Sequence, residues 1–577
     1  MKFDDILKTV GEFGPYQQRV YVISLIFKFT VSWATMISVF MNASVDHWCA
    51  TPEWDPGCEK YGLSDEACEQ AQKNGSIPSN YTSDGELVYA QCEKYNVSGV
   101  GFWPSIDPSN YSSATTSCED GWVYDDSQYE TTTVTDFDLV CGKGDLTQVS
   151  QSIYYGGFLA GSIFFGILSD IIGRWWTLFL TNLVSLISGV AIVFSPTWWF
   201  FATMRFFMGF GNIAFNITLY VIGTEYIGPS KRSLIILVST TYALGYMFLA
   251  LPAYFIRSWR LLTLIVTLPL LFLFICFIWL PESARWLISV GKYDKAEKVI
   301  SKVAEVNKAE LPKPLFTKEY REEEDQIRKA HRPSGLDLIR TPRMRMRTIN
   351  LVFIWMVNAM VYHGLSLNSS NLGVNDYVAF AITGGIEIPA YFMDIFIVEF
   401  FGRRFSLFFC LMVGGLACLS SAFIPSGVAL TTVAMVGKFG ITGSFAVIYL
   451  YTVELYPTNI RGVAIGNCSM FSRVASISAP LVLILAKYWD PLPLVIYGSL
   501  SVIASLSALA LPETRGRKLP ETLEEGEQFG LKTTHADESI EEKDHDAFEN
   551  GLTHSEKGMM SSGTAHQNPA FIMEDDK

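Results

Sequence analysis

Long hydrophobic runs recur along most of the chain and set the first expectations about its structure. A helix that spans a bilayer needs about 20 mostly apolar residues, because the hydrocarbon core is about 30 Å thick and an α-helix rises about 1.5 Å per residue. By that criterion the sequence predicts twelve spans, at 18–42, 146–168, 175–194, 198–224, 233–256, 261–280, 349–367, 377–399, 406–424, 428–453, 462–486 and 492–511. We therefore expect an all-α integral membrane protein.

The second half of the chain repeats charged positions of the first half at a constant spacing. Each later residue lies 229 positions after its counterpart, and the pairs are Arg174 and Arg403, Glu225 and Glu454, and Arg232 and Arg461. Leu-Pro-Glu-Ser at 280–283 also recurs as Leu-Pro-Glu-Thr at 511–514. Two six-helix halves with a site between them at mid-membrane depth are typical of alternating-access carriers.

The runs and repeats divide the chain into five predicted parts. Two of them are the six-helix halves, and the first half includes a long polar loop between its first two spans. The parts are an N-terminal segment at 1–17, a first half at 18–280 with the polar loop at 44–145, a linker at 281–347, a second half at 348–511 and a disordered acidic tail at 512–577. Tyr293 to Val306 in the linker has the pattern of an amphipathic helix.

Basic residues predict the orientation of these spans. They fall on alternate loops and in the linker, and include Arg174, Arg232, Arg285, Arg403, Arg404 and Arg461. Because loops rich in lysine and arginine stay cytoplasmic, both termini are expected inside and the loop at 44–145 outside. Asp4 and Asp5 stand where a cleavable signal would carry basic residues, so we expect the first span to remain as the insertion signal.

Composition agrees with a membrane setting once the charge is located. Half of the residues are hydrophobic, only 17 % are charged, and the formal net charge is −14. Nearly all of the acidic excess lies in the segments 44–145 and 513–577, so the hydrophobic body is close to neutral. A basic surface for nucleic acid is not supported.

The composition of the polar loop predicts that it lies in an oxidising compartment. It contains six of the ten cysteines, namely Cys49, Cys58, Cys68, Cys92, Cys118 and Cys141. It also contains or borders five glycosylation sequons, at Asn42, Asn74, Asn80, Asn96 and Asn110. We expect a disulfide-linked, glycosylated extracellular domain, although six cysteines allow 15 pairings that the sequence does not distinguish.

A charged motif between the second and third spans predicts a conformational gate. The segment Gly166-Ile-Leu-Ser-Asp170-Ile-Ile-Gly173-Arg174 is a form of the major facilitator loop pattern, and its second copy has Glu399 where Asp170 maps. Together with the repeated glutamates and arginines, these charges are candidate gate residues: Asp170, Arg174, Glu225, Arg232, Glu399, Arg403, Glu454 and Arg461. The alternative is that the arginines only set the topology.

Several motifs together resemble one family, the organic cation and carnitine transporters of solute carrier family twenty-two. They are Gly11-Glu-Phe-Gly-Pro15, the six-cysteine loop, Pro281-Glu-Ser-Ala-Arg-Trp-Leu287, Val453-Glu-Leu-Tyr-Pro-Thr458 and Leu511-Pro-Glu-Thr-Arg515. The resemblance covers residues 1 to about 525 and implies a major facilitator fold of twelve transmembrane helices in two halves. The carnitine-type branch is the most similar, through segments such as Gly437-Lys-Phe-Gly-Ile-Thr442.

Ionisable residues near the middle of the spans are the candidates for substrate binding, because each is costly there unless it is paired or faces water. Lys28, Glu387 and Arg473 lie near predicted helix centres, with Lys438 further out. The resemblance implies an aspartate at the position of Arg473 in dedicated cation carriers and an arginine in anion and carnitine carriers. A guanidinium can bind a carboxylate bidentately. The alternative for Glu387 and Arg473 is a structural ion pair. Lys28 could snorkel, pair with Glu387, or lie on another face of the helix if the first span is misplaced.

Aromatic residues can supply the complementary part of the site. Trp355 and Tyr362 lie seven residues apart and so share a helix face, and Tyr246 is a further candidate. A ring face within about 6 Å attracts a quaternary ammonium group. The alternative is that these rings only pack helices together.

The sequence therefore predicts a plasma-membrane transporter of organic cations or zwitterions, with carnitine-like compounds favoured. An organic-anion carrier that uses Arg473 and Lys438 is the first alternative, and a transporter-like receptor or sensor is the second. No enzyme activity, cofactor or metal is expected. The coupling ion, Na⁺ or H⁺, and the oligomeric state are left open. The expected partners are a small-molecule substrate and the lipid bilayer.

Overall fold

The computed structural model describes residues 3–81, 87–97, 100–102, 114–228, 235–312, 315–329, 335–371, 374–425, 427–457, 460–517, 519–520 and 522–530. Arg232, Asn110 and most of the predicted acidic tail, including all of 531–577, lie outside these residues. Met1–Glu527 form one compact unit and Gln528–Lys577 a second, and the first contains the helices described below except for Gln528, the last residue of the last helix.

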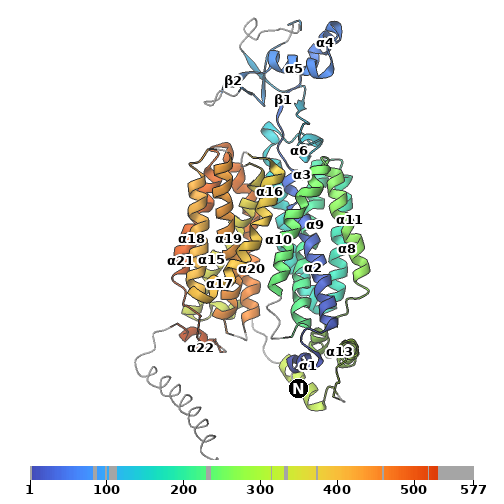
Figure 1. Cartoon of the computed structure of the whole chain (residues 1–577), viewed down its shortest axis with the longest axis vertical. Helices are drawn as coiled ribbons and strands as arrows, with labels where there is room; N and C mark the ends of the chain where they lie inside the picture. Colours follow the sequence, from blue (N-terminus) through green and yellow to red (C-terminus); the bar gives the residue numbers. More distant parts are fainter. Residues whose placement is uncertain are drawn as a thin grey trace, which may run out of the picture. The chain divides into compact units, whose positions relative to one another are not determined.

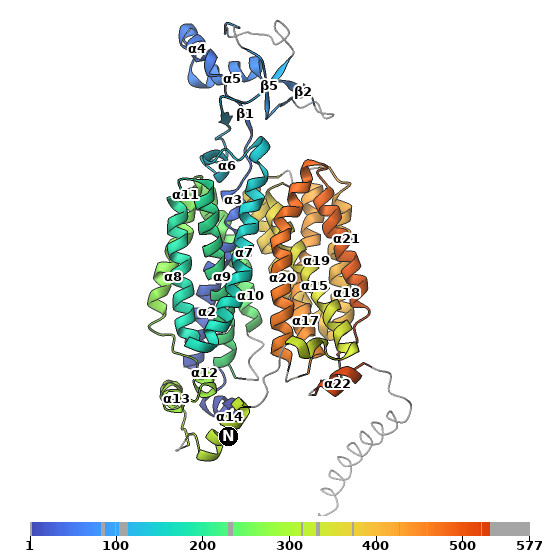
Figure 2. The same cartoon turned by 180° about the vertical axis from the view of Figure 1, so that it is seen from behind.

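The helices form two groups of six that follow each other along the chain (Figures 1 and 2). The first group is α2 (Pro15–Met36) continued by α3 (Ser38–Met41), α7 (Asp145–Ile172), α8 (Arg174–Val193), α9 (Trp198–Tyr226), α10 (Ile235–Phe255) and α11 (Trp259–Cys276). The second group is α15 (Pro342–Leu367), α16 (Asp376–Gly385) continued by α17 (Glu387–Phe401), α18 (Arg403–Ser421), α19 (Val428–Leu455), α20 (Arg461–Leu483) and α21 (Leu492–Ala508). The predicted arrangement of two six-helix halves is confirmed.

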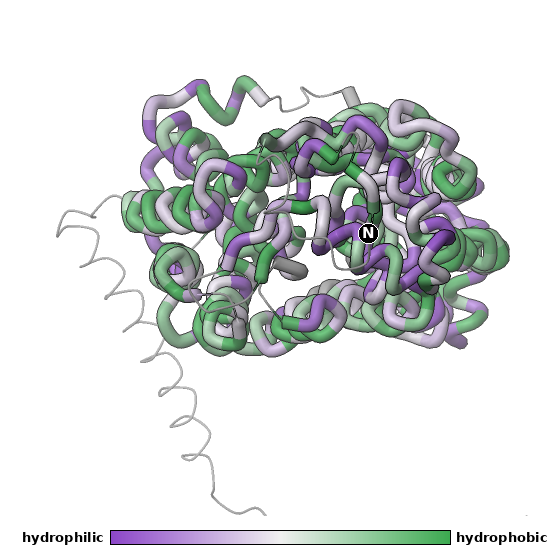
Figure 3. Tube along the Cα trace, turned by 90° about the horizontal axis from the view of Figure 1, so that it is seen from above, coloured by the Kyte–Doolittle hydropathy of each residue, from purple (hydrophilic) through white to green (hydrophobic). Residues whose placement is uncertain are grey.

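Helix length and composition fit a bilayer. In the part of the chain that the structure describes, ten helices are long and apolar enough to cross a membrane, and α21 is a shorter apolar helix. Large hydrophobic side chains on these helices are exposed, among them Phe164, Ile167, Ile171 and Phe396. Figure 3 shows hydrophobic residues along most of the helical trace. Such a surface is stable in lipid rather than water.

The segment between α3 and α7 forms a small separate structure at one end of the helices, which we call the loop end (Figure 1). It contains α4 (Asp55–Tyr61), α5 (Asp65–Ser76), α6 (Thr133–Asp136) and the 3₁₀-helices η1 (Pro52–Trp54) and η3 (Cys141–Lys143). Three antiparallel strand pairs complete it: β1 (His47–Cys49) with β6 (Trp122–Tyr124), β2 (Ser79–Tyr81) with β3 (Leu87–Tyr89), and β4 (Glu93–Tyr95) with β5 (Thr115–Ser117).

All six loop cysteines are paired. The disulfides are Cys49–Cys118, Cys58–Cys68 and Cys92–Cys141. Among the predicted sequons, Asn74, Asn80 and Asn96 are exposed. Asn42 is half-buried, and its side-chain oxygen accepts a hydrogen bond from the hydroxyl of Thr133 at 2.8 Å. The exposed sequons are therefore better placed to carry glycans.

Short helices lie at the opposite end, which we call the linker end. They are α1 (Phe3–Val10), α12 (Ala284–Ser289), α13 (Tyr293–Asn307), α14 (Lys318–Lys329) and α22 (Leu523–Gln528), with the 3₁₀-helix η5 (Gly335–Ile339). The helix α13 covers the amphipathic stretch that the sequence predicted. Two further 3₁₀-helices, η6 (Asn368–Asn371) and η7 (Ile484–Lys487), follow α15 and α20.

The two halves meet through α7 with α20 and through α10 with α16 and α17. Gly384 of α16 lies so close to α10 that a Cβ added there would stand 2.7 Å from the backbone nitrogen of Met247. At the loop end, Asp376 at the start of α16 accepts hydrogen bonds from Gln128 and Tyr129 at 3.0 and 2.8 Å. The halves are therefore joined at the loop end in this conformation.

Candidate functional site

A buried ion pair lies in the second half, beside the interface. The Nζ of Lys438 on α19 is 3.0 Å from Oε1 of Glu387 on α17, and their side chains are 1 % and 0 % exposed. The Nζ also donates to the Ser366 hydroxyl at 2.6 Å. Oε2 of Glu387 is buried and has no hydrogen-bond partner among the described residues. The structure therefore joins two predicted substrate residues and leaves one carboxylate oxygen available.

A break in the eighth predicted span puts Glu387 at the start of a helix. The sequence predicted one helix at 377–399, whereas α16 ends at Gly385 and α17 begins at Glu387. Pro389 has no N–H to donate to the carbonyl of Gly385, so the hydrogen-bond ladder is interrupted at this turn. Glu387 consequently stands in the first turn of α17, where the helix dipole favours a negative charge.

Aromatic rings form a wall next to the ion pair. The phenol of Tyr362 donates to Oε1 of Glu387 at 2.7 Å, and Lys438 lies 3.3 Å from the centre of the same ring. Phe445 follows at 5.5 Å from Tyr362, and then Tyr449 at 6.0 Å from Phe445. Trp355 lies 4.4 Å from Tyr449. We call these residues, Trp355, Tyr362, Phe445 and Tyr449, the aromatic wall.

Arg473 lies at the other end of the aromatic wall. Its guanidinium interacts electrostatically with Tyr449 and donates to the carbonyl and hydroxyl oxygens of Ser469, one turn earlier on α20, at 2.5 and 2.6 Å. Its Nε is buried without a partner among the described residues. The alternative interpretation of Glu387 and Arg473 as an ion pair is wrong, because Glu387 pairs with Lys438.

Residues of the first half face the ion pair from α10. Tyr246 is fully buried, with its ring 5.9 Å from the Nζ of Lys438 and 4.5 Å from the ring of Phe380. Tyr242 interacts electrostatically with Glu387, and the centre of its ring lies 5.4 Å from the Nζ of Lys28. Lys28 donates to the side-chain oxygen of Asn216 at 2.6 Å, so the predicted pairing of Lys28 with Glu387 is wrong. Lys28 therefore adds a positive charge on the first-half side.

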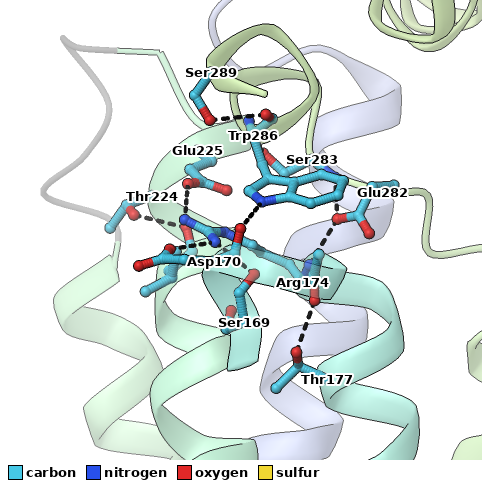
Figure 4. A network of polar contacts seen from close by, with 12 residues as sticks. Ser169, Asp170, Arg174, Thr177, Thr224, Glu225, Glu282, Ser283, Trp286 and Ser289 are labelled. Atoms are coloured by element: carbon cyan, nitrogen blue, oxygen red, sulfur yellow. Dashed lines mark hydrogen bonds and ion pairs between the residues drawn. The ribbon is translucent and has the colours of Figure 1, made fainter. Parts of the chain in front are cut away.

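The predicted gate charges form a compact network at the linker end of the first half (Figure 4). Arg174 begins α8, and its guanidinium binds Asp170 at 2.7 Å and Glu225 at 3.4 Å. These contacts join the ends of α7 and α9 to the start of α8. The Asp170 side chain is 75 % exposed, whereas that of Glu225 is 11 % exposed.

The second half repeats only part of this network. Arg403 binds Glu454 at 2.8 Å, which corresponds to Arg174 with Glu225. Glu399 is exposed. Within the described part of the chain it forms no ion pair with Arg403, unlike Asp170 with Arg174. Arg461 donates through Nε to the carbonyl of Tyr456 at 3.4 Å.

Two repeated glutamates were missed as site residues. Glu282 accepts hydrogen bonds from the backbone nitrogens of Arg174 and Trp175 at 2.8 and 3.3 Å, which caps the start of α8. Burial raises the pKa of Glu282, while the backbone donors of Ser283, Arg174 and Trp175 oppose that rise. Glu513 likewise accepts from the backbone nitrogens of Arg403 and Arg404. The repeated Leu-Pro-Glu motif was the signal for this role.

The cap geometry accounts for the glycines in both motifs. Gly173 and Gly402 precede the capped helices with φ of +106° and +81°, values that side chains rarely allow. A Cβ at either glycine would also lie within 2.7 Å of the capping carboxylate. The Gly-Arg pairs thus let a glutamate that follows the sixth helix of each half reach the start of the third.

The fold, the repeat and the duplicated charge network define a membrane carrier with a duplicated six-helix unit. The sequence profile of the sugar (and other) transporter family matches residues 110–525. The chain is 36 % identical over 545 residues to the organic cation transporter protein of Drosophila melanogaster, covering 92 % of this chain and 96 % of the relative. It is 33 % identical over 537 residues to the human organic cation/carnitine transporter 2, covering 91 % and 93 %.

A further relative is the beta-alanine transporter of Drosophila melanogaster, with 34 % identity over 558 residues that cover 92 % of this chain and 90 % of the relative. Among solved structures, the E. coli xylose transporter XylE in a partially occluded inward-open conformation matches with a TM-score of 0.57 and 14 % identity, covering 87 % of this chain and all of that one. The chain belongs to the sugar (and other) transporter family of major facilitators and, within it, to the organic cation and carnitine transporters of solute carrier family 22. It is a membrane transporter and not an enzyme.

Proposed function

We propose that this protein carries small zwitterions that combine a carboxylate with an ammonium group, such as carnitine. The observation that carries this proposal is the pair of available atoms at the two ends of the aromatic wall. Oε2 of Glu387 can accept and Nε of Arg473 can donate, and each is buried without a partner among the described residues. A zwitterion presents the complementary charges at its two ends.

The cationic end of such a substrate fits the Glu387 end of the wall. The ring of Phe445, 5.5 Å from that of Tyr362, offers a π face that attracts ammonium groups when these come within about 6 Å. The available oxygen of Glu387 adds electrostatic attraction. Lys438 already lies 3.3 Å from the centre of the Tyr362 ring and is held by Glu387 and Ser366, so the ammonium group of the substrate is placed against Phe445.

The anionic end fits Arg473. A guanidinium presents donors in a planar fork that matches a carboxylate, and charge-assisted hydrogen bonds of this kind are about twice as strong as neutral ones. Arg473 uses Nη1 for Ser469 and keeps Nε available. In the free protein, Ser469 holds the guanidinium next to the wall, which reduces the entropy lost on binding.

The charge of the site favours a zwitterion over a simple cation. Lys438 compensates Glu387, so Arg473 leaves an excess of positive charge, and Lys28 adds to it from the first half. A monocation would meet that excess with no anion to offset it. Two of the relatives are named for transport of carnitine and of beta-alanine, and both compounds carry an amine or ammonium and a carboxylate.

In this proposal the protein lies in the plasma membrane, with the loop end outside and both termini inside. Three disulfides and the exposed sequons support an external loop, since disulfides persist in oxidising compartments. The segment 281–347 is then the cytoplasmic linker and 512–577 a cytoplasmic tail. Substrate binds between the halves, which rock to expose it to either side, and the two charge networks hold the linker end in one state.

The test is uptake of labelled carnitine, tetraethylammonium and para-aminohippurate by cells with verified surface expression of the protein. We expect carnitine to be taken up fastest. Arg473→Asp should lower carnitine uptake at least tenfold and leave or raise tetraethylammonium uptake, because the carboxylate loses its partner. Arg345→Asp, at an exposed arginine near the start of α15, is the matched control and should retain the wild-type preference.

Each outcome separates the candidates. Preference for para-aminohippurate would mean that the substrate class is organic anions rather than zwitterions. The excess of positive charge in the site is the observation that favours this alternative. Preference for tetraethylammonium, or an equal loss of all substrates in Arg473→Asp, would assign Arg473 a structural role. Uptake of none of the three by surface-expressed protein would contradict the proposal and favour a receptor or sensor.

A further inference from the structure

A second carboxylate is buried in the same helix as Glu387 and takes no part in the site described above. Asp394 of α17 is 5 % exposed, and its Oδ2 has no hydrogen-bond partner among the described residues. Its Oδ1 lies 3.9 Å from the Sγ of Cys410 on α18. Within the described part of the chain, no lysine or arginine pairs with it.

Such a group is expensive at this depth if it is ionised. Burying an uncompensated carboxylate costs several kcal/mol, and proteins usually avoid this cost by pairing or protonating the group. One S–H donor is a weak substitute for a cation. Asp394 is therefore best accommodated in this conformation as the neutral acid.

The neighbours of Asp394 fit a proton better than a metal cation. Gly443 of α19 is packed against the carboxyl group, since a Cβ there would stand 2.7 Å from Oδ1. Hard cations such as Ca²⁺ take six or more oxygen ligands. A thiol and a glycine do not provide them.

The other titratable groups around α17 are engaged elsewhere. Lys438 of α19 is bound to Glu387, and Tyr242 and Tyr246 of α10 lie against the same glutamate. Tyr391 is the exception, because it interacts electrostatically with both Glu387 and Asp394. Cys410 is the titratable group that α18 contributes.

The spacing links Asp394 to the ion pair. It lies seven residues after Glu387, so the two carboxyl groups share a face of α17 about 10 Å apart along the axis. Asp394 is also seven residues before the end of α17 at Phe401, on the linker-end side of the site. The helix α17 contacts α10 of the opposite half, so it belongs to the surface across which the halves move.

We propose that Asp394 is a proton-binding site of the transport cycle, coupled through Tyr391 to the Glu387–Lys438 pair. The carboxylate takes a proton from water to become the neutral acid in the conformation described here. It returns that proton to water when the packing of α17 against α19 loosens in another conformation. The proton comes from hydronium in the adjoining water and returns to water, so the charge of the helix face changes by one unit when the proton binds and reverts when it leaves.

The first test does not depend on the substrate. Infrared spectra of the purified full-length protein, recorded as a function of pH, should contain a carbonyl band of a protonated carboxyl group that is lost on alkaline titration. Asp394→Asn should remove this band, and Cys410→Ala should keep it but move the midpoint of its loss. Asp65→Asn, at an exposed position of α5, is the control and should leave the band unchanged.

The second test is uptake at a fixed membrane potential across a range of external pH. We expect the wild type to show a pH-dependent rate and Asp394→Asn to flatten that profile, because the asparagine mimics the protonated acid permanently. If Asp394→Asn does not reach the membrane, Cys410→Ala still tests the proposal, because a shift in the pH at which the band is lost would assign the band to Asp394. A band that survives Asp394→Asn, a band that persists at every pH, or an unaltered pH profile in Asp394→Asn would overturn the proposal. Because the infrared test needs no substrate, it distinguishes this failure from a wrong substrate class.

Discussion

Lys438 and Glu387 form an ion pair of 3.0 Å between α19 and α17, although both side chains are almost completely buried. Burial removes water from both charges, and this cost is offset only by good geometry and additional hydrogen bonds. Tyr362 and Ser366 supply such bonds, one to each partner. The pair therefore depends on both of its members.

Removing one member of this pair should destabilise the protein strongly. Lys438→Met leaves Glu387 as an uncompensated buried charge, for which the expected loss of stability is about 3–5 kcal/mol. The double variant Lys438→Met/Glu387→Gln should regain much of that loss, because no isolated charge is left. Thermal unfolding in detergent measures both. Equal stability of the single and double variants would mean that the pair is not coupled in this way.

The aromatic wall should contribute to affinity for ammonium substrates. Trp355 is fully buried, and its indole N–H donates to Thr452 at 3.0 Å. Replacing it by leucine removes the ring that packs against Phe445 and Tyr449, so the wall should lose about 0.5–2 kcal/mol of its attraction for the ammonium group and the KM for carnitine should rise about 2-fold to 30-fold. Trp199→Leu, at a tryptophan that is 74 % exposed on the surface of α9, is the control and should leave KM unchanged. A lower rate with unchanged KM in Trp355→Leu would instead point to a packing role.

The two carboxylates that bind Arg174 should differ in importance. Asp170 is 75 % exposed, and exposed ion pairs contribute about 1 kcal/mol or less. Glu225 is 11 % exposed and is the partner that the second half repeats as Glu454. Glu225→Gln should therefore reduce uptake more than Asp170→Asn does. Side-by-side uptake rates at matched surface expression check this order, and the reverse order would assign the gate to Asp170.

Much of this fold follows from the sequence, because a membrane imposes length and polarity on every span. The repeat of Arg174 as Arg403 also identified the two ion pairs with Glu225 and Glu454, although not the capping glutamates Glu282 and Glu513. The partners were harder to predict. Lys438 lies in the outer part of its predicted span, so the sequence offered Arg473 and Lys28, but not Lys438, as alternative partners of Glu387. In the structure Glu387 stands in the first turn of α17 and pairs with Lys438 of α19, a relation between two helices that the sequence alone does not show.

The contact between Tyr129 and Asp376 supports a prediction about the loop end. The phenol donates to Oδ2 at 2.8 Å, and Gln128 donates to the same oxygen at 3.0 Å. Burial, and next the nearby charge of Asp376, raise the pKa of Tyr129 well above its ordinary value. Because that pKa is higher in the folded protein than in the unfolded chain, the stabilisation is complete below the unfolded value of about 10 and is lost only as pH rises toward the folded value. The contact should therefore hold throughout the physiological range.

Tyr129→Phe should loosen the joint between the halves at this end. The lost hydrogen bond is worth about 0.5–1.5 kcal/mol, so backbone amides in the first turns of α16 should exchange with deuterium about 2-fold to 10-fold faster. Lys487→Met is the matched control, because the pair of Lys487 with Asp145 also joins the halves but is about half exposed. Hydrogen exchange read by mass spectrometry compares the two variants. Unchanged exchange of α16 in Tyr129→Phe, or a larger change in Lys487→Met, would show that the loop end is held by the exposed ion pair instead.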